Sequence, residues 1–243
     1  MLTYSLRCDA KKAREAVGGD YAVVELGGPV RVVEAVVSLY SGDMPVCMYK
    51  SWRLTYTDFA QLGLSKAEVY VGAERTVVRL VRGDEKIGLK ELVEGRPLVV
   101  HAMDVNEGGI AYRVFRLGGY TELVAKGVAS SIAEAFTPKK GVNILVVDLP
   151  MMPQYERALK ELLAISREHY VELHTTMLSD VCPICGGRMI KRGRLVYCPR
   201  CKVQLNRDVN AAWTLARNII RRLGRTEQLA ELREVFMLYY PDV

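Results

Sequence analysis

Short runs of β-branched residues, separated by glycine-rich turns, make up the first part of this sequence. Strands are predicted for residues 21–26, 30–40, 52–56, 68–71 and 76–82. The run at 30–40 reads VRVVEAVVSLY and lies between the turn signals Gly27-Gly28-Pro29 and Ser41-Gly42-Asp43. Residues 11–16 predict a short helix, which Gly18 would end. The first part of the chain is therefore expected to be mostly β.

From residue 98 onward the pattern changes to longer elements. Residues 98–115 predict two strands joined by a tight turn at Gly108-Gly109, because glycine readily takes the positive φ that such a turn needs. Residues 117–121 predict a second hairpin turn, and residues 125–136 predict a short helix. The change of pattern at Glu94-Gly95-Arg96-Pro97 indicates a domain boundary.

A nearly continuous apolar run, VNILVVDLP, fills residues 142–150. Such a run is typical of a central strand that is buried on both faces. Helical spacing follows at residues 153–168, and residues 170–174 predict a further strand. A later amphipathic helix is expected to run from Asp208, as the N-cap, to Gly224, as the C-cap. A last helix begins at about residue 226. The chain is therefore predicted to hold a β-rich module over residues 1–95 and a mixed α/β domain over residues 96–243.

Two Cys-x-x-Cys pairs give the strongest chemical signal. Cys182 and Cys185 lie in CPICGG, and Cys198 and Cys201 follow in CPRCK after an interval of twelve residues. Four thiolates at this spacing close a tetrahedron of soft ligands, which suits Zn²⁺ better than a hard cation. Two disulfides in a secreted domain are the alternative, and the absence of a signal-peptide core at the N-terminus argues against it.

The composition indicates a globular protein of the cytoplasm. Half of the 243 residues are hydrophobic, and no run of about 18 apolar residues predicts a membrane span. Cys8 and Cys47 remain after the metal ligands are assigned, and we expect them to be free thiols in a reducing compartment. Asn and Gln are sparse while Glu, Arg and Val are plentiful, which is typical of a thermophile.

The positive charge gathers late in the chain. The net charge is +6 and the pI is about 9.0, which favours an anionic partner such as nucleic acid. The candidate contacts to DNA or RNA are Arg188, Lys191, Arg192, Arg194 and Arg207. A solvated basic face is the alternative reading of the same residues.

Three aspartates lie where a carboxylate could reach a shared metal site. Asp104 and Asp148 lie at the ends of predicted strands, and Asp208 lies at the start of a predicted helix. Carboxylate oxygens are ligands for Mg²⁺ or Mn²⁺, and two such ions about 4 Å apart assist phosphodiester cleavage. Strand-end aspartates also cap turns, so spacing alone leaves both interpretations open.

Four stretches carry a resemblance to a known family. They are VHAMDVNEGGIAYRVF at 100–115, NILVVDLP at 143–150, HYVELHTTMLSDVCPICGG at 169–187 and YCPRCKVQLNRDVNAAWTLARNI at 197–219. Over roughly residues 98–222 the chain resembles the C-terminal half of the TnpB (OrfB) transposon-associated proteins. Those proteins are RNA-guided DNA endonucleases, and their RNase H-like, RuvC-type nuclease domain is interrupted by a zinc ribbon.

The resemblance implies a fold, a set of site residues and a set of partners. The fold is α/β, with an RNase H-like (RuvC-type) mixed sheet, flanking helices, a zinc ribbon inserted at residues 179–205, and a small β-rich domain before it that is similar to a wedge-like β-barrel. Asp104 matches the first catalytic carboxylate and Asp208 the third, and the four cysteines match the ribbon ligands. The implied partners are DNA and RNA, including a guide RNA.

The sequence departs from the family pattern at two motifs. The family usually carries Glu-Asp-Leu at the end of the central strand, and this chain reads Val147-Asp148-Leu149. A shift of one residue along a strand reverses the direction of the side chain, so Asp148 would face away from the expected site. Asn206 also replaces a common aspartate before Arg207-Asp208.

Three functions stay open from the sequence. The first is a metal-dependent DNA endonuclease in which Asp104, Asp148 and Asp208 hold Mg²⁺ or Mn²⁺. The second is an inactive, domesticated nucleic-acid-binding protein that keeps the fold and the zinc ribbon. The third is a zinc-ribbon scaffold that binds other proteins.

Overall fold

The computed structural model describes most of the chain in two compact units. The described residues are 2–33, 36–50, 63–73, 75–82, 95–150, 153–174 and 178–240. Unit 1 consists of residues 1–86 and 151–175, and unit 2 consists of residues 87–150 and 176–243. The strand predicted at 52–56 lies outside the described residues.

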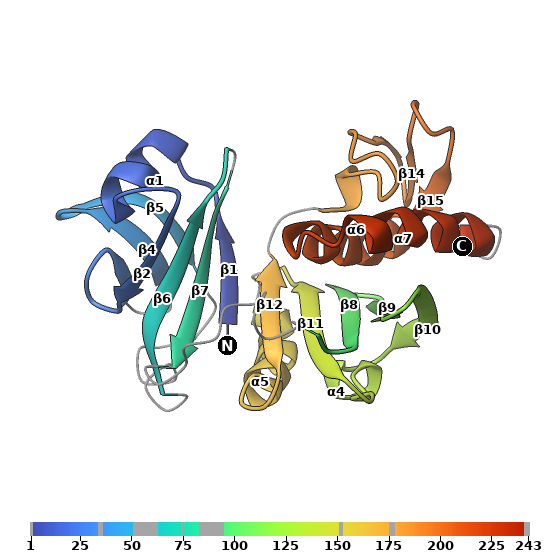
Figure 1. Cartoon of the computed structure of the whole chain (residues 1–243), viewed down its shortest axis with the longest axis horizontal. Coiled ribbons are helices and arrows are strands. Elements are labelled where there is room, and N and C mark those ends of the chain that lie inside the picture. The colour runs from blue at the N-terminus through green and yellow to red at the C-terminus, as the bar shows by residue number, and fades with distance from the viewer. Residues whose placement is uncertain are drawn as a thin grey trace. The chain divides into compact units, whose positions relative to one another are not determined.

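Unit 1 contains two antiparallel sheets (Figure 1). The four-stranded sheet has the order β1 (Leu2–Leu6), β7 (Thr76–Arg82), β6 (Leu64–Val71) and β2 (Tyr21–Glu25). The three-stranded sheet has the order β3 (Val30–Val33), β4 (Val36–Ser41) and β5 (Met44–Lys50). The β-rich character predicted for this part is confirmed, and its similarity to a wedge-like barrel stays a prediction.

The run at 30–40 is not one strand. It forms β3 and β4, which pair with each other in antiparallel register, with Val30 opposite Leu39 and Val33 opposite Val36. In the hairpin, the main-chain N–H and C=O groups of the two strands form hydrogen bonds with each other. One long strand would need a partner from a distant part of the chain for the same groups. Hydrophobicity alone does not mark such a reversal.

Helix α1 (Ala10–Val17) begins and ends as the sequence predicts. The carboxylate of Asp9 accepts a hydrogen bond from the Lys12 N–H at 3.0 Å and so caps the first turn. Gly18 ends the helix at φ +78°, a left-handed conformation that glycine takes without steric cost.

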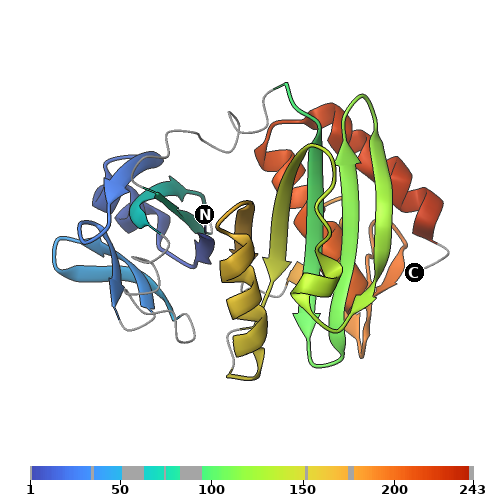
Figure 2. The ribbon, with the colours of Figure 1, turned by 90° about the horizontal axis from the view of Figure 1, so that it is seen from below.

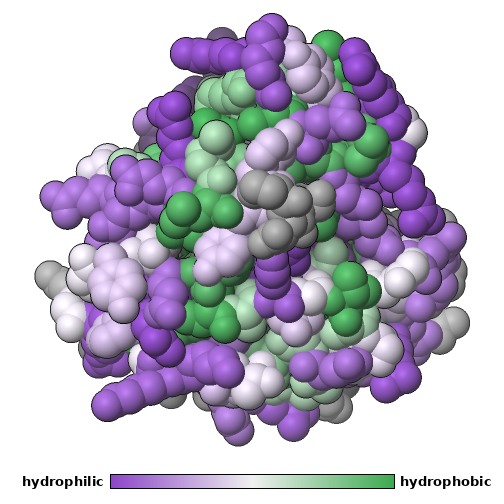
Figure 3. All heavy atoms as spheres, turned by 90° about the vertical axis from the view of Figure 1, so that its right-hand side faces the viewer, coloured by the Kyte–Doolittle hydropathy of each residue, from purple (hydrophilic) through white to green (hydrophobic). Residues whose placement is uncertain are grey.

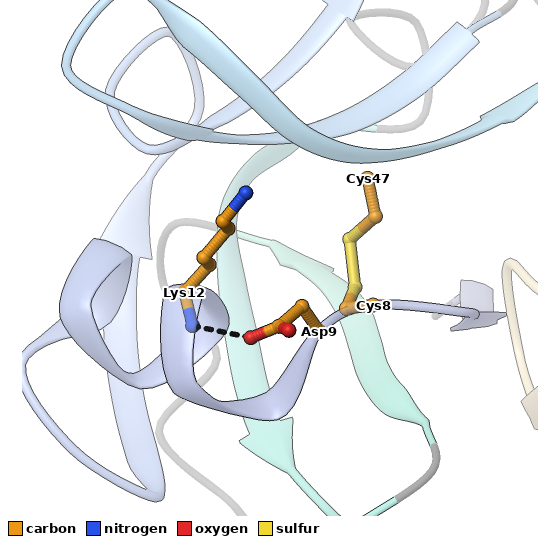
Figure 4. Close-up of a disulfide and its surroundings, with 4 residues drawn as sticks. All are labelled: Cys8, Asp9, Lys12 and Cys47. Carbon is orange, nitrogen blue, oxygen red and sulfur yellow. Dashed lines mark hydrogen bonds between the residues drawn. A yellow bond between two sulfur atoms is a disulfide. The ribbon is translucent and has the colours of Figure 1, made fainter.

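Cys8 and Cys47 form a disulfide, so the prediction of free thiols is wrong (Figure 4). Cys8 lies between β1 and α1, and Cys47 lies in β5, with the two Cα atoms 5.1 Å apart. That separation falls within the range that a disulfide spans. The bond fastens the segment before α1 to the three-stranded sheet.

Unit 1 also contains residues from the middle of the chain. Helix α5 (Glu156–Ile165) follows the short 3-10 turn η1 (Pro153–Tyr155), and β12 (Tyr170–His174) lies beside β1. The sequence places these elements within a domain over residues 96–243, whereas the contacts group residues 151–175 with unit 1. The predicted domain boundary therefore stays a prediction.

Unit 2 is built on four adjacent strands in the order β10, β9, β8 and β11. They are β8 (Leu98–Asn106), β9 (Gly109–Leu117), β10 (Thr121–Ala129) and β11 (Val142–Asp148). Strands β8, β9 and β10 are antiparallel, whereas β11 runs parallel to β8. The hairpin at 98–115 and the buried strand at 142–150 are confirmed.

The helix predicted at 125–136 is wrong for most of its length. Residues up to Ala129 continue β10, and only Ile132–Ala135 form a helix, α4. Pairing along β9, with Lys126 opposite Arg113, outweighs the local helical preference of this segment. The hydroxyl of Ser131 accepts a hydrogen bond from the Glu134 N–H at 3.1 Å and caps the short helix.

Two long helices cover one face of this sheet, and α4 lies on the other (Figure 2). They are α6 (Arg207–Arg222) and α7 (Thr226–Tyr239). Trp213 of α6 connects the layers, because its ring centroid lies 4.8 Å from that of Phe115 in β9 and 5.1 Å from that of Phe236 in α7. The helix-covered face is therefore the one to which Phe115 points.

Among the described residues, no helix is both long enough and apolar enough to cross a membrane. The face drawn in Figure 3 is covered largely by hydrophilic side chains, with smaller hydrophobic areas between them. This surface resembles that of an ordinary globular protein, on which isolated apolar residues are common.

Removing the disulfide is expected to destabilise the protein. The bond closes a loop with a sequence separation of 39 residues, and the loss of such a constraint costs roughly 4 kcal/mol in the chain-entropy account. Cys8→Ser should therefore lower the unfolding temperature by several degrees. Titration of thiols in the denatured, metal-free protein should detect four free thiols before reduction and all six after it. Six free thiols without any reductant would contradict the bond.

Candidate metal centre and acidic site

The four cysteines lie in a small ribbon that precedes α6. Its strands are β13 (Ile190–Arg192), β14 (Leu195–Tyr197) and β15 (Gln204–Asn206), in the antiparallel order β13, β14, β15. The first cysteine pair comes before β13, and the second pair lies between β14 and β15. The ribbon thus brings two loops that are distant in the sequence to one end of a short sheet.

The two cysteine loops share one hydrogen-bonding pattern. In the first loop the Gly186 N–H donates to the Cys182 carbonyl at 2.9 Å, and in the second the Lys202 N–H donates to the Cys198 carbonyl at 2.8 Å. Gly186 and Lys202 both have positive φ, +72° and +59°. Because the left-handed conformation costs a side chain roughly 1 kcal/mol or more, Lys202 is the strained member of the pair.

The four thiols have the geometry that zinc requires. Their Sγ atoms all lie within 4.8 Å of one another, and the Sγ atoms of Cys185 and Cys198 are 3.7 Å apart. Four sulfurs at the usual Zn–S distance, arranged as a tetrahedron, lie about 3.8 Å from each other. Soft thiolate donors in this arrangement fit a structural zinc ion, as the spacing predicts.

Main-chain N–H groups point at the sulfurs. The Gly187 N–H donates to the Cys185 Sγ at 3.4 Å, and the Cys201 N–H donates to the Cys198 Sγ at 3.3 Å. Burial raises the pKa of the Cys185 thiol, but the Gly187 N–H and the neighbouring thiols outweigh it and lower that pKa to about 7. Burial raises the pKa of the Cys182 thiol. One thiolate is thus favoured before the metal binds, and the metal must displace the remaining protons.

Helix α6 holds the ribbon through two polar side chains. The Asn210 amide donates to the Ser179 carbonyl at 2.8 Å and to the Val181 carbonyl at 2.9 Å. The Thr214 hydroxyl donates to the Val181 carbonyl at 2.9 Å. Both side chains are fully buried. This role was not predicted from the sequence. The available signal was the spacing of Asn210 and Thr214, which lie four residues apart and therefore on the same face of the helix.

Asn206, not Asp208, caps α6. Its side-chain oxygen accepts a hydrogen bond from the Asp208 N–H at 2.9 Å. Asp208 therefore lies within the first turn, where the partial positive charge of the helix N-terminus favours a carboxylate. Asn206 replaces an aspartate of the family pattern, and an amide oxygen serves equally well as an N-cap.

Asp104 lies close to Asp208. Burial, and then the charge of Asp208, raise the pKa of the Asp104 carboxyl from 3.8 to about 7. The Asn106 amide, 3.4 Å from the Asp104 Oδ2, and the charge of Arg207 act in the opposite direction. Asp104 belongs to β8 and Asp208 to α6, so the fold brings two carboxylates together from segments about one hundred residues apart.

Asp148 lies next to Asp104 in the sheet. The two residues are partners in the parallel register of β11 and β8, and paired residues of neighbouring strands point to the same face. The expectation that Asp148 faces away is therefore wrong, because the register of β11 decides its direction. Its Oδ2 accepts a hydrogen bond from the Leu178 N–H at 3.4 Å. Among the described residues, the four cysteines form the one group of three or more side chains that could hold a metal ion.

The predicted nucleic-acid contacts are all exposed. They are Arg188, Lys191, Arg192, Arg194 and Arg207. Three of them have intramolecular partners: Lys191 pairs with Asp180 at 2.9 Å, Arg192 lies over the Tyr197 ring, and Arg207 lies 3.5 Å from the Asp208 carboxylate. The Arg207 N–H also donates to the Arg194 carbonyl at 2.8 Å. This contact brings basic residues of the ribbon to the acidic site.

Arg113 is a basic residue that the sequence did not single out. It lies in β9 opposite Ala102, two residues before Asp104 in β8, and so faces the helices as Asp104 does. Its side chain is buried and donates to the Tyr112 carbonyl at 2.8 Å, and it pairs with no carboxylate of the described residues. Burial lowers the pKa of the Arg113 guanidinium, as expected of a cation without a counter-ion.

Comparison with protein families identifies the ribbon. Residues 166–215 match the Cas12f1-like, TNB domain. The matched segment contains all four cysteines, Asn210 and Asp208. It relates the chain to TnpB/Cas12-type proteins, as the sequence predicts, and ends at residue 215, near the middle of α6. No curated protein matches the chain.

The two left-handed positions give a matched pair of substitutions. Lys202→Gly is expected to stabilise the zinc-loaded protein by up to about 1 kcal/mol, because glycine removes the steric cost at φ +59°. Gly186→Ala is expected to destabilise it, since a Cβ there would also lie 2.7 Å from the Arg217 Nη2. Thermal unfolding of both variants measures the difference. Shifts of the same sign would contradict this account.

Asp104→Asn is expected to stabilise the protein more at pH 8 than at pH 5, without Mg²⁺ or Mn²⁺. The folded state keeps the Asp104 proton up to about pH 7, whereas the unfolded chain releases it near pH 4. Wild-type stability therefore falls as the pH rises between these values, by on the order of 4 kcal/mol from this group. Urea unfolding at both pH values measures the gain. Asp43→Asn, at an exposed carboxylate, is the control. An equal gain at both pH values would exclude the raised pKa.

Proposed function

We propose that the protein binds nucleic acid and cleaves DNA as a metal-dependent endonuclease related to TnpB. The observation that carries the proposal is the pair of carboxylates, Asp104 and Asp208, which the fold holds close together despite their mutual repulsion. Like charges that approach in a partly buried place are typical of functional sites. A divalent cation removes the repulsion.

The architecture of unit 2 supports an RNase H-like assignment. Three antiparallel strands are followed by a fourth, β11, which runs parallel to the first and lies next to it. The first carboxylate comes from β8, the strand between β9 and β11, and the other from the helix that covers the same face. The match of residues 166–215 to the Cas12f1-like, TNB domain supports the same relationship from the ribbon.

Asp104 and Asp208 would hold Mg²⁺ or Mn²⁺. Mg²⁺ is usually held by one or two carboxylates and completes its coordination with water and substrate phosphates, so two aspartates suffice. The bound ion would supply activation of water and stabilisation of the leaving oxygen. Asp148 lies beside Asp104 and is the third candidate ligand, and cleavage by two metal ions would need it.

The basic residues would bind the nucleic-acid backbone. Arg194 and Arg207 touch through their main chains beside Asp208, where a phosphate would approach the ion. Arg113, buried on the same face and without a carboxylate partner, offers a further donor to a phosphate oxygen. The resemblance to TnpB extends this to guidance by RNA in the cytoplasm.

A second candidate function is binding without cleavage. Val147 stands where the family usually carries the second catalytic glutamate, and Asp148 binds the Leu178 N–H. An aspartate with such a hydrogen bond can have a structural role without binding a metal ion. The protein would then hold DNA or RNA as a domesticated relative that keeps the ribbon.

A cleavage assay separates these functions. The zinc-loaded protein is incubated with end-labelled single- and double-stranded DNA and Mn²⁺, with and without RNA copurified from the expression host. We expect cleavage by the wild type and a loss of at least about 100-fold in Asp104→Asn, which removes a charge that binds the ion. Asp180→Asn, at an acid paired with Lys191 in the ribbon, is the control and should cleave as the wild type does.

The other outcomes decide between the remaining functions. Equal cleavage by Asp104→Asn and the wild type would refute the assignment of the site. Binding that weakens with salt, but without cleavage, would establish the inactive nucleic-acid-binding protein. Absence of binding at low salt would leave the protein-binding scaffold.

A further inference from the structure

Arg217 lies on the face of α6 that holds the ribbon. It follows Asn210 by seven residues and Thr214 by three, a spacing that places the three side chains on one side of a helix. Asn210 and Thr214 bind the carbonyls of Ser179 and Val181, immediately before Cys182. The third side chain of this row is therefore directed at the first cysteine loop.

The guanidinium of Arg217 rests against that loop. A Cβ built on Gly186 would lie 2.7 Å from the Arg217 Nη2, 3.1 Å from its Cζ and 3.2 Å from its Nη1. The first distance is shorter than real Cβ contacts, and the other two are tighter than most of them, so a side chain at position 186 would displace the guanidinium. Glycine at this position therefore serves two needs, the left-handed turn and the space for the guanidinium.

The positive charge of Arg217 has no carboxylate partner among the described residues. Its Nε is buried and without a hydrogen-bond partner. Partial burial and the charge of Arg221 disfavour its positive charge, whereas Cys182 and Cys185, as thiolates, favour it. Arg217 is partly buried, and a guanidinium drawn from water gains from a counter-ion, which the cysteine loop against which it rests can provide.

A zinc tetrathiolate supplies that counter-ion. Four thiolates carry four negative charges and Zn²⁺ neutralises two, which leaves a net charge of about −2 on the centre. We propose that Arg217 is the positioning residue of the zinc centre: its guanidinium offsets the charge of the Cys182 and Cys185 thiolates and fastens the first cysteine loop to α6.

This assignment links metal binding to the helix that carries Asp208. Zinc binding gives the partly buried charge of Arg217 a partner, and Arg217 lies on the same helix as Asn210 and Thr214. Metal binding therefore stabilises the contact between the first cysteine loop and α6 through Arg217. Partners in the outer shell of a metal site commonly change metal affinity by 10- to 100-fold.

The test compares four proteins in metal binding alone. Arg217→Met removes the charge and keeps much of the length, Arg217→Lys keeps the charge without the planar fork, and Arg221→Met is the matched control one turn away on α6, at an exposed position. Each protein is loaded with Co²⁺, whose thiolate charge-transfer absorption reports the tetrathiolate, and titrated with a competing chelator. Zn²⁺ is measured in the same way.

We expect Arg217→Met to weaken metal binding by about 10- to 100-fold and to speed metal release correspondingly. Arg217→Lys should lie between Arg217→Met and the wild type, and Arg221→Met should stay within about twofold of the wild type. Equal affinities for Arg217→Met and Arg221→Met would overturn the proposal.

Stability of the metal-free protein separates charge compensation from packing. If Arg217 acts by charge, Arg217→Met leaves the metal-free protein as stable as the wild type or more stable, because a partly buried, uncompensated cation is removed. If the side chain only fills space, the variant is destabilised with and without metal, and the proposal is wrong. These measurements use no nucleic acid, so a failure of the cleavage assay leaves them unaffected.

Discussion

The hydrogen bonds from Asn210 and Thr214 to the Ser179 and Val181 carbonyls determine how unit 2 is assembled. They join α6 to the short 3-10 turn Leu178–Asp180 and the residue after it, immediately before the first cysteine loop. A buried carbonyl or amide without a hydrogen-bond partner costs about 1–3 kcal/mol. These hydrogen bonds therefore favour one position of α6 relative to the ribbon. Because Asp208 lies in the first turn of the same helix, the same hydrogen bonds help to fix its position.

Two faces of α6 are buried, and this explains its composition. One face carries Trp213 and packs against the sheet through Phe115. The neighbouring face carries Asn210 and Thr214 and packs against main-chain carbonyls. An apolar residue at position 210 would pack but leave the Ser179 carbonyl without this hydrogen bond. The short side chains of Ala211 and Ala212 let both layers approach closely.

The sequence predicts those parts of the fold whose signal is local. The spacing of Cys182, Cys185, Cys198 and Cys201 encodes the metal centre directly, because a tetrahedral site constrains the loops that supply it. The apolar run at 142–150 encodes a buried strand. The helix expected at 125–136 fails because pairing with β9 is a long-range effect that no local preference records. The direction of Asp148 likewise depends on the register of β11 against β8.

The disulfide shows how a general rule can mislead. Free thiols were expected for Cys8 and Cys47 because reducing compartments keep thiols reduced, and the sequence gives no sign that two residues 39 positions apart meet. Intracellular proteins of hyperthermophiles are the exception to that rule, and a composition poor in Asn and Gln is consistent with it. Both arguments were present in the sequence, but only the three-dimensional contact decides between them.

The acidic site is a place where the structure opposes its own stability. Asp104 is partly buried close to Asp208, and burial together with that charge raises its pKa, so the arrangement lowers stability at neutral pH. The Asn206 cap, the Asn210 and Thr214 anchors and the β8–β11 pairing keep the two carboxylates from separating. A cation that enters such a site meets ligands that are already in place, so the ordering cost has been met during folding. The rigid α6 thus keeps the two aspartates together despite their repulsion. This lowers the stability of the metal-free protein and raises its affinity for a divalent ion.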